Sequence, residues 1–507
     1  MTHSPPTPVI VGAAQFMQQK DAQTPLDPLG LMAEAGRRAL ASSGTQTVGE
    51  IIDAISVANI VGWSYADAPS ELAQALGLSP SETTYLPIGG QSPQMMVNRA
   101  AMDIAAGKHR AVLLAGGEAD YAIRRALKSG LVLNWPEQRQ PEKIDGDMDL
   151  GISELESRYQ LFFPAPVYAM FETAIRYADG RDHEAHMKHM GRLLEPFSRI
   201  AADHPHGWLE TAYTADEIAT PGPKNRYIAY PYTLRMVSNR YVDQSAAIII
   251  TSTEMAEKAG IDRKHWVFPM GGADLGNISH VSQRPFLHNS PATRQSARLA
   301  LEQSGLTLDD MDMFDIYSCF PSMIEMGRRE IGIPTDDPRG LTVTGGLPFF
   351  GGPFNNYSMH AIVTVVDRIR ENPAQKAMVF AQGGFNTKAS VGIYGTEPPA
   401  EPWGSGGVAD LQADVQASID GEAMPEPVDR AEGRLRVEAY TLHYDRSGHA
   451  ESGTVIGRLE NDQRALARID AYPEILRTFE TKELVGRTGG VRFDEGLGLN
   501  LFTPGAS

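Results

Sequence analysis

The stretch ALASSG at residues 39–44 recurs as ALEQSG at residues 300–305, which begins 261 positions later. Each copy ends a helical pattern and leads to an apolar strand pattern, IDAISVANI after the first and MFDIYSCF after the second. The pair Gly89-Gly90 recurs in the same way as Gly351-Gly352, 262 positions later, and a proline closely follows each pair. Two nearly equal offsets indicate that the chain contains two copies of one βα design.

Each Gly-Gly pair is followed by a helical segment and then by a buried-strand pattern that ends in glycines. The strand patterns read AVLLAGG at residues 111–117 and AMVFAQGG at residues 377–384. Continuous apolar runs of this kind are typical of a sheet that helices cover on both faces. The sequence therefore predicts an α/β fold, with an N-terminal half at residues 1–120 and 243–262 and a C-terminal half at residues 263–396.

Three further segments complete the predicted domain organisation. Residues 121–242 have no counterpart in the second half and are expected to form an inserted loop domain. Residues 397–433 hold nine acidic residues and one basic residue, as a linker does, and include a short amphipathic helical pattern. Residues 434–507 alternate in the manner of strands and are expected to form an extra β-barrel, OB-like in type. That barrel has ten basic and eleven acidic residues, which disfavours nucleic-acid binding.

The composition of the chain narrows its function class. The 507 residues carry a formal net charge of −18, which disfavours nonspecific attraction to nucleic acid or to anionic lipid. No apolar run approaches the roughly 20 residues that cross a bilayer, and the start of the chain lacks the pattern of a signal peptide. We therefore expect a cytoplasmic protein without membrane contact. The single cysteine, Cys319, excludes an internal disulfide framework.

The sequence GGQSP, from Gly89 to Pro93, lies between a strand pattern and a helix pattern. Ser92 suits the N-cap, Pro93 suits the first helical turn, and the glycines let the backbone approach a ligand closely. Free N–H groups and the positive end of the helix would then face an anion or an oxyanion. The alternative is a plain glycine turn. In the related loop after Gly345, the amides of Asn355 and Asn356 gather near two phenylalanines, which favours a binding loop.

Several of these segments together resemble the thiolase superfamily. They are VIVGAAQF at the start, the strand AVLLAGGEA, the run DQSAA, the loop FDIYSCFPS, the loop TVTGGLPFFGGP and the strand VFAQGGF. In particular, the chain is similar to the thiolase-like proteins of type 1, which are related to sterol-carrier-protein thiolases and bear an extra C-terminal domain. The resemblance implies a duplicated five-layered αβαβα sandwich. It also implies a monomer or a homodimer.

The resemblance also identifies catalytic positions, and this chain departs from the thiolase pattern at each of them. The nucleophilic cysteine aligns with Gly90, and the histidine of the GHP motif aligns with Gly352. The second cysteine aligns with Ala381, and the Asn or His of the NEAF or HDCF loop aligns with Tyr317. Ordinary thiolysis through a cysteine thioester at residue 90 is therefore excluded.

Part of the thiolase machinery is retained in this comparison. The resemblance implies an oxyanion hole formed by the backbone N–H groups of Gly90 and Gly384, beside the helix start at Ser92. Cys319 stands in the loop where sterol-carrier thiolases keep an acid/base cysteine. The alternative for Cys319 is a small buried hydrophobic residue, and a catalytic role requires a lowered thiol pKa.

A relative of the thiolases is also expected to bind coenzyme A, whose phosphates need cations. Residues 222–242 contain Lys224, Arg226, Arg235 and Arg240 and no acidic residue. The resemblance implies that this stretch contacts the nucleotide part of coenzyme A, whereas the alternative is a set of solvated surface bases. The histidines of HEAHMKHM lack the HExxH spacing, and no Walker loop or GxGxxG follows a strand. We therefore expect no metal and no nucleotide redox cofactor.

These observations lead to two functional hypotheses. The first is a thiolase-like acyltransferase or lyase of lipid or ketone metabolism, which forms or cleaves a carbon–carbon bond in an acyl-CoA or β-keto substrate. In this hypothesis Cys319 and Tyr317 are the catalytic residues, and Ser92, Asn355, Asn356, Lys224, Arg226 and Arg235 bind the substrate. The alternative is a catalytically inactive CoA- or acyl-binding protein.

Overall fold

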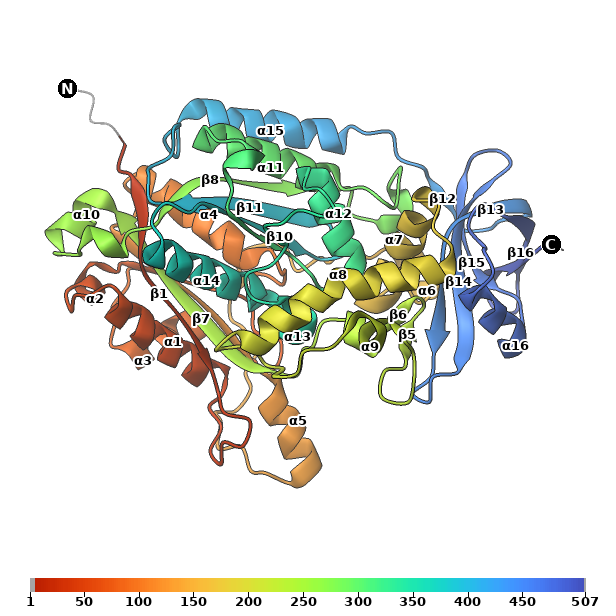
Figure 1. Cartoon of the computed structure of the whole chain (residues 1–507), viewed down its shortest axis with the longest axis horizontal. Helices are drawn as coiled ribbons and strands as arrows, with labels where there is room; N and C mark the ends of the chain where they lie inside the picture. The colour runs from red at the N-terminus through yellow and green to blue at the C-terminus, as the bar shows by residue number, and fades with distance from the viewer. Residues whose placement is uncertain (1–4, 506–507) are drawn as a thin grey trace.

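The computed structural model describes residues 5–505, and two β-sheets form its centre (Figure 1). The first sheet has the strand order β1-β7-β4-β2-β3. Its strands are β1 (Pro8–Met17), β2 (Ala54–Val57), β3 (Glu82–Tyr85), β4 (Ala111–Ala119) and β7 (Asp243–Ser252). Strands β2, β3 and β4 run parallel to one another, while β7 is antiparallel to both of its neighbours.

The second sheet repeats the first, strand for strand, except that it has no counterpart of β3. Its order is β8-β11-β10-β9, with two antiparallel pairs followed by one parallel pair. The strands are β8 (Phe268–Gly276), β9 (Met313–Ile316), β10 (Ala377–Gly383) and β11 (Lys388–Gly395). This repetition agrees with the two copies of one βα design that the sequence predicts.

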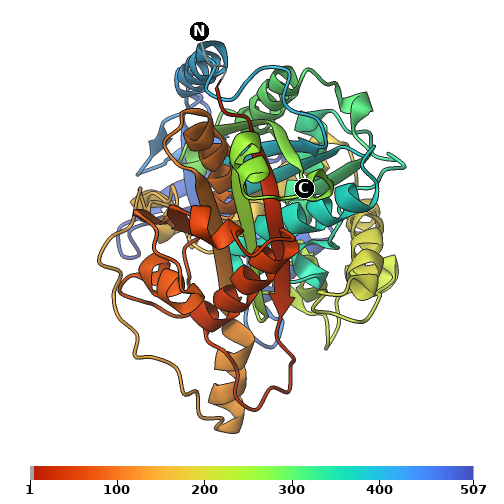
Figure 2. The ribbon, with the colours of Figure 1, turned by 90° about the vertical axis from the view of Figure 1, so that its left-hand side faces the viewer.

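Helices lie between the two sheets and on their outer faces. Helices α4 (Ser92–Ala105) and α14 (Tyr357–Glu371) contact strands of both sheets and are therefore buried on nearly every side. Helices α1 (Pro28–Ser42) and α3 (Ala68–Leu76) cover the first sheet, in red and orange in Figure 2. Helices α11 (Pro291–Ser304) and α12 (Pro321–Ile331) cover the second. The repeated sequences ALASSG and ALEQSG end α1 and α11.

Residues 120–236 contain most of the remaining helices and a small hairpin. They are α5 (Asp120–Ser129), α6 (Glu154–Arg158), α7 (Pro164–Ala178), α8 (His183–Asp203), α9 (Ala215–Ala219), β5 (Tyr227–Ala229), β6 (Tyr232–Thr233) and the 3-10 helix η1 (Leu234–Met236). Short helices elsewhere are α2 (Val48–Ile51), α10 (Thr253–Lys258), α13 (Gly346–Phe349) and α16 (Pro473–Leu476). No helix among residues 5–505 is long and apolar enough to cross a bilayer.

Both sheets have an edge that another part of the chain covers. The helix predicted in the acidic segment is α15 (Gly406–Asp420), and it lies along β8. There the side-chain oxygens of Gln412 and Gln416 accept hydrogen bonds from the backbone N–H groups of Asp274 and Gly276, at 3.2 and 2.7 Å. These bonds satisfy donors that an edge strand otherwise leaves open to other chains.

The edge of β3 is covered by the segment that connects α5 to α6. The N–H group of Asp145 donates to the carbonyl of Tyr85 at 2.8 Å, and the Asp145 carboxylate accepts from the Tyr85 N–H group at 3.2 Å. Figure 2 shows this segment as an orange loop along the outside of the molecule. The chain therefore supplies its own partner for this edge.

Five strands at the C-terminal end form a closed barrel (Figure 1, blue). They are β13 (Gly433–Tyr444), β14 (Ala450–Leu459), β15 (Arg464–Ile469), β16 (Thr488–Asp494) and β17 (Leu499–Thr503). Pairing follows the ring β13-β14-β15-β17-β16-β13, in which β15 and β17 are parallel. A short strand, β12 (Pro427–Val428), pairs with β15. The C-terminal part of the chain is therefore a five-stranded β-barrel with one parallel pair.

The barrel is joined to the rest of the molecule by paired strands and by a buried ion pair. Strand β5 pairs with β13 at Ala229 and His443, which the sequence did not indicate. The guanidinium of Arg176 on α7 is 1% exposed and donates to both carboxylate oxygens of Glu483, at 2.5 and 2.8 Å. Burial raises the pKa of Glu483, but the hydrogen bond and charge of Arg176 outweigh it, so this pKa lies below the usual value.

We expect Glu483→Gln to lower the free energy of unfolding by about 2 kcal/mol at neutral pH, because it leaves the Arg176 charge buried without its partner. A carboxylate with a lowered pKa stabilises the fold above its unfolded pKa of about 4.3 and loses this effect as the pH falls. The difference between the two proteins should therefore shrink in urea unfolding measured at progressively lower pH. Glu495→Gln breaks an exposed pair with Arg430 and is the control, with an expected change below about 1 kcal/mol. Equal losses for both variants would contradict the importance of this junction.

Candidate functional site

The loop Gly89-Gly90 lies between β3 and α4 and is held by the segment that begins α14. The N–H group of Gly89 donates to Asn355 Oδ1 at 2.8 Å, and Ser358 Oγ donates to the carbonyl of Gly90 at 2.9 Å. Helix α4 begins at Ser92 as expected, but the prediction that Ser92 is the N-cap is wrong, because the cap is Gln91. The Ser92 hydroxyl donates to the carbonyl of Pro87 at 3.5 Å, so it turns back into the protein.

Tyr317 occupies the space that a side chain at residue 90 would need. A Cβ atom at Gly90 would lie 2.2 Å from Tyr317 Oη and 2.6 Å from the carbonyl oxygen of Gln382. Both distances are shorter than any contact that a real Cβ atom makes. The Tyr317 ring is 5% exposed and packs edge-on against Tyr357. The phenol therefore stands where the resemblance to thiolases places the nucleophilic cysteine.

Cys319 belongs to a buried hydrogen-bonded group beside Tyr317. Gln382 Nε2 donates to Cys319 Sγ at 3.3 Å and to the hydroxyl of Tyr168 at 2.8 Å. Burial raises the pKa of the Cys319 thiol to about 12. Burial, with the nearby thiol next, also raises the pKa of the Tyr317 phenol well above its usual value. At neutral pH both groups are therefore uncharged.

The second glycine loop, Gly383-Gly384, lies against the first. A Cβ atom at Gly383 would lie 3.1 Å from the backbone nitrogen of Gly90 and 1.8 Å from Gln91 Oε1. Gln91 is 3% exposed, and its Oε1 has no hydrogen-bond partner within residues 5–505. Gly384 has a φ of 61°, and its carbonyl accepts a hydrogen bond from Tyr168. The structure therefore brings together the Gly90 and Gly384 loops that the sequence paired as an oxyanion hole.

Other positions named in the sequence are also filled by neighbouring side chains. A Cβ atom at Gly352 would lie 2.1 Å from Ser238 Oγ, so no histidine fits there. Asn355 Nδ2 donates to the carbonyl of Asn59, and Asn356 Nδ2 donates to the carbonyl of Gly116. These two amides join the halves of the fold. They were expected to face a substrate.

The basic residues predicted to hold coenzyme A do not converge on the glycine loops. Arg235 stacks on Tyr213 and donates to the carbonyl of Glu217. Arg226 donates to the carbonyl of Tyr227, and Lys224 is exposed. The loop at Gly448 of the barrel approaches the Cβ atom of Arg226. Lys224 and Arg226, two positions apart in the chain, are together called the surface patch.

Sequence reasoning missed the residues that complete the buried group. Gln91 follows the pair Gly89-Gly90 and Gln382 precedes the pair Gly383-Gly384, and a polar side chain beside each glycine pair was a signal that could have been used. Tyr168 lies on α7, more than 200 residues from Gln382, and the hydrogen bond that joins them is visible only in the fold.

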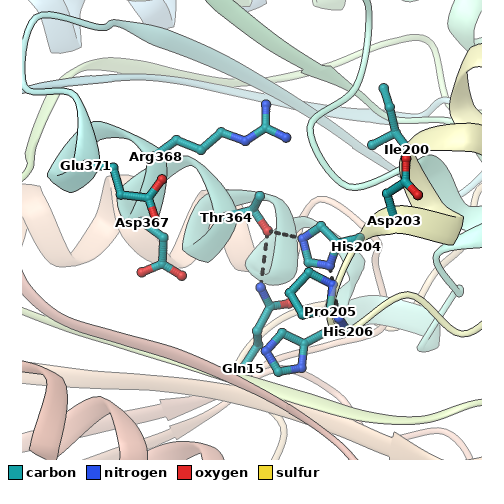
Figure 3. A pocket seen from close by; sticks show the side chains of 10 residues that line it. All are labelled: Gln15, Ile200, Asp203, His204, Pro205, His206, Thr364, Asp367, Arg368 and Glu371. Carbon is teal, nitrogen blue, oxygen red and sulfur yellow. Dashed lines mark hydrogen bonds between the residues drawn. The ribbon is translucent and has the colours of Figure 1, made fainter.

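A separate cavity of about 390 Å³ opens between the end of α8 and one face of α14 (Figure 3). On its floor Thr364 Oγ1 lies 3.2 Å from both Gln15 Nε2 and His204 Nε2. The carboxylates around it belong to Asp203, Asp367 and Glu371, against the single cation of Arg368. This acidic lining does not suit the phosphates of coenzyme A, and none of the glycine loops described above lines it.

We expect Gly90→Ala to lower the free energy of unfolding by about 3 kcal/mol, because the added methyl group overlaps Tyr317 and the Gln382 backbone. Adding Tyr317→Phe should recover about 1 kcal/mol of this loss, since it removes the nearest of the overlapping atoms. Urea unfolding of the single and double variants measures both effects. Gly490→Ala is the control, because a Cβ atom there meets no atom within 4 Å. If Gly90→Ala is as stable as this control, residue 90 has room for a side chain.

Two thiolases are distantly similar to this chain. An acetyl-CoA acetyltransferase of Syntrophomonas wolfei is 28% identical over 149 residues, which are 29% of this chain and 35% of that protein. The chain therefore spans about a third of the length of that curated relative. Human mitochondrial 3-ketoacyl-CoA thiolase in complex with CoA has 16% identity and a TM-score of 0.53, over 77% of this chain and 98% of that one. This second likeness shows the fold alone.

One solved structure is similar along its whole length. It is a monomeric SCP2-thiolase like protein type 1 from Mycobacterium smegmatis, with a TM-score of 0.84 and 33% identity over 99% of each chain. Residues 414–496 also match the family model of the thiolase-like protein type 1 additional C-terminal domain. The expected thiolase-like α/β fold with a C-terminal barrel is thereby confirmed, and the chain belongs to the thiolase-like proteins of type 1.

Proposed function

We propose that this protein binds a CoA thioester or a related β-keto acyl compound without forming a cysteine-bound acyl-enzyme. The observation that carries the proposal is the position of Tyr317, whose hydroxyl takes the place of a side chain at residue 90. The thiolase nucleophile is thus absent from the sequence, and the space it would need is filled. Of the two functions considered from sequence, the binding protein fits this geometry better than the acyltransferase.

Cys319 does not replace the missing nucleophile in this proposal. Burial raises the pKa of this thiol, so the neutral thiol is the form present at neutral pH, whereas the thiolate is the reactive form. Its sulfur also accepts a hydrogen bond from Gln382 inside the protein. Cys319 is therefore a buried neutral group of the loop.

Coenzyme A is the ligand class that the fold and the surface charge favour. The human thiolase of the same fold was solved in complex with CoA. The patch of Lys224 and Arg226 offers two cations in a chain of net charge −18, and charge-assisted bonds to phosphate are among the stronger polar contacts. Arg235 is left out of the test of this patch. Its guanidinium stacks on Tyr213 and donates to the carbonyl of Glu217, so a substitution there would also disturb the local structure.

We expect CoA and acetyl-CoA to bind in isothermal titration calorimetry, and Lys224→Glu with Arg226→Glu to weaken binding more than tenfold by replacing attraction with repulsion. Lys258→Glu, an exposed change on α10, is the matched control and should leave the affinity unchanged. Unchanged affinity in the double variant removes the patch from the site. No heat with either ligand, while the protein is folded, rejects CoA binding altogether.

One observation favours a second candidate, a carbon–carbon lyase or acyltransferase that works without a covalent intermediate. The Tyr317 hydroxyl lies between the loops of Gly90 and Gln382, and its raised pKa keeps the proton in place at neutral pH. A protonated phenol there can donate to the oxyanion of an enolate as it forms. In this candidate Cys319 is a neighbouring neutral donor.

The two candidates differ in turnover. Acyl-CoA and β-keto acid substrates should give no product with the parent protein if it only binds its ligand. If product forms, Tyr317→Phe should lower kcat at least tenfold, because it removes the donor, whereas Cys319→Ala should leave kcat within about twofold. Thermal unfolding of both variants checks that the fold is kept. If Cys319→Ala alone lowers kcat strongly, Cys319 is catalytic, and the conclusion that it is a neutral, non-catalytic thiol is wrong.

A further inference from the structure

A cavity of about 190 Å³ lies where the barrel meets the thiolase-like part of the chain. Its walls come from the end of α7, from the loop after η3 (Val281–Gln283) and from β13, where Arg436 is exposed. The side chains that matter are those of Tyr177, Phe286, His288, Arg436, Glu438 and Arg464. None of them belongs to the glycine loops or to the surface patch described above.

The charges in this cavity are unbalanced. Both carboxylate oxygens of Glu438 are already used, by Arg458 at 3.0 Å and by Arg464 at 2.9 Å. Arg436 lies directly across the strands from Arg458, and opposed like charges in a sheet are destabilising. Within residues 5–505, Arg436 makes no ion pair. An anion bound in the cavity would supply the partner that this guanidinium lacks.

The rest of the lining is aromatic and apolar. Phe286 is 58% exposed and Tyr177 is 49% exposed, although both are large hydrophobic residues. His288 lies beside Phe286, with ring centroids 5.7 Å apart, and burial, with Arg329 next, lowers its pKa. It is therefore a neutral hydrogen-bonding ring at neutral pH. A cavity of about 150 Å³ accommodates benzene, so 190 Å³ is enough for one ring with a small substituent.

We propose that this cavity is a binding site for a monocyclic aromatic carboxylate, with the carboxylate paired to Arg436 and the ring packed against Phe286 and Tyr177. A planar carboxylate matches the two parallel N–H groups of a guanidinium. Aromatic side chains bind a further ring by offset or edge-on contact. The site is separate from the proposed CoA site, so each can be tested and can fail without the other.

Benzoate is the probe, added to the full-length protein and followed by ligand-observed NMR. We expect a dissociation constant on the order of 1 mM, as for a ligand of this size. Benzyl alcohol has the same ring without the charge and should bind at least tenfold more weakly. Phe286→Ala, a change at an exposed residue, should also weaken benzoate binding severalfold.

The deciding variant is Arg436→Gln, which should weaken benzoate binding at least tenfold. Arg434→Gln changes an exposed arginine two residues earlier on the same strand, outside the cavity, and should leave the affinity unchanged. Thermal unfolding confirms that each variant is folded. The proposal is overturned if benzoate does not bind at up to about 10 mM, if both arginine variants weaken it equally, or if benzyl alcohol binds as well as benzoate.

Discussion

Glycines in the two sheets leave room for side-chain amides that reach across from neighbouring segments, and the packing of the halves depends on this fit. A Cβ atom at any of these glycines would lie within 2.3 Å of an amide atom. The pairs are Gly392 with Gln94, Gly272 with Asn98, Gly116 with Asn356 and Gly383 with Gln91. Asn98 is bonded as well as packed, since its side-chain N–H group donates to Asp274 and to the carbonyl of Val391. Each contact therefore fixes both the spacing and the register of the two halves.

The same constraint explains why the candidate site is a packed group of side chains. Where the helices approach the glycine loops, Tyr317, Ser238 and Gln91 fill the volumes next to Gly90, Gly352 and Gly383. The polar atoms of this group are satisfied mainly by one another, as Gln382 is by Tyr168 and Cys319. Burial then raises the pKa of each acidic group there and keeps it neutral. The neutral state of the Tyr317 and Cys319 side chains therefore follows from how tightly the site is packed.

The repeat, the strands and the barrel could be predicted because hydrophobic periodicity reports local structure directly. The loop of Tyr317 and Cys319 was also found, through its resemblance to thiolases. The N-cap at Ser92 was misplaced by one residue, which is a common error where a helix begins. The contacts of Tyr168, and the pairing of Ala229 with His443, join residues more than 200 positions apart, and no local pattern encodes them. The solvent exposure and the pKa of Tyr317 and Cys319 depend on such contacts, so they could not be predicted from the sequence.

The overlap between residue 90 and Tyr317 also bears on how such a protein evolves. A change of Gly90 to cysteine, made first, introduces a side chain into space that the phenol already fills. A change of Tyr317 to a smaller residue, made first, leaves a hole in a buried region, which is destabilising as well. Each step toward a thiolase is therefore unfavourable until the other has been taken. Such mutual dependence makes a cysteine at residue 90 difficult to introduce by single substitutions.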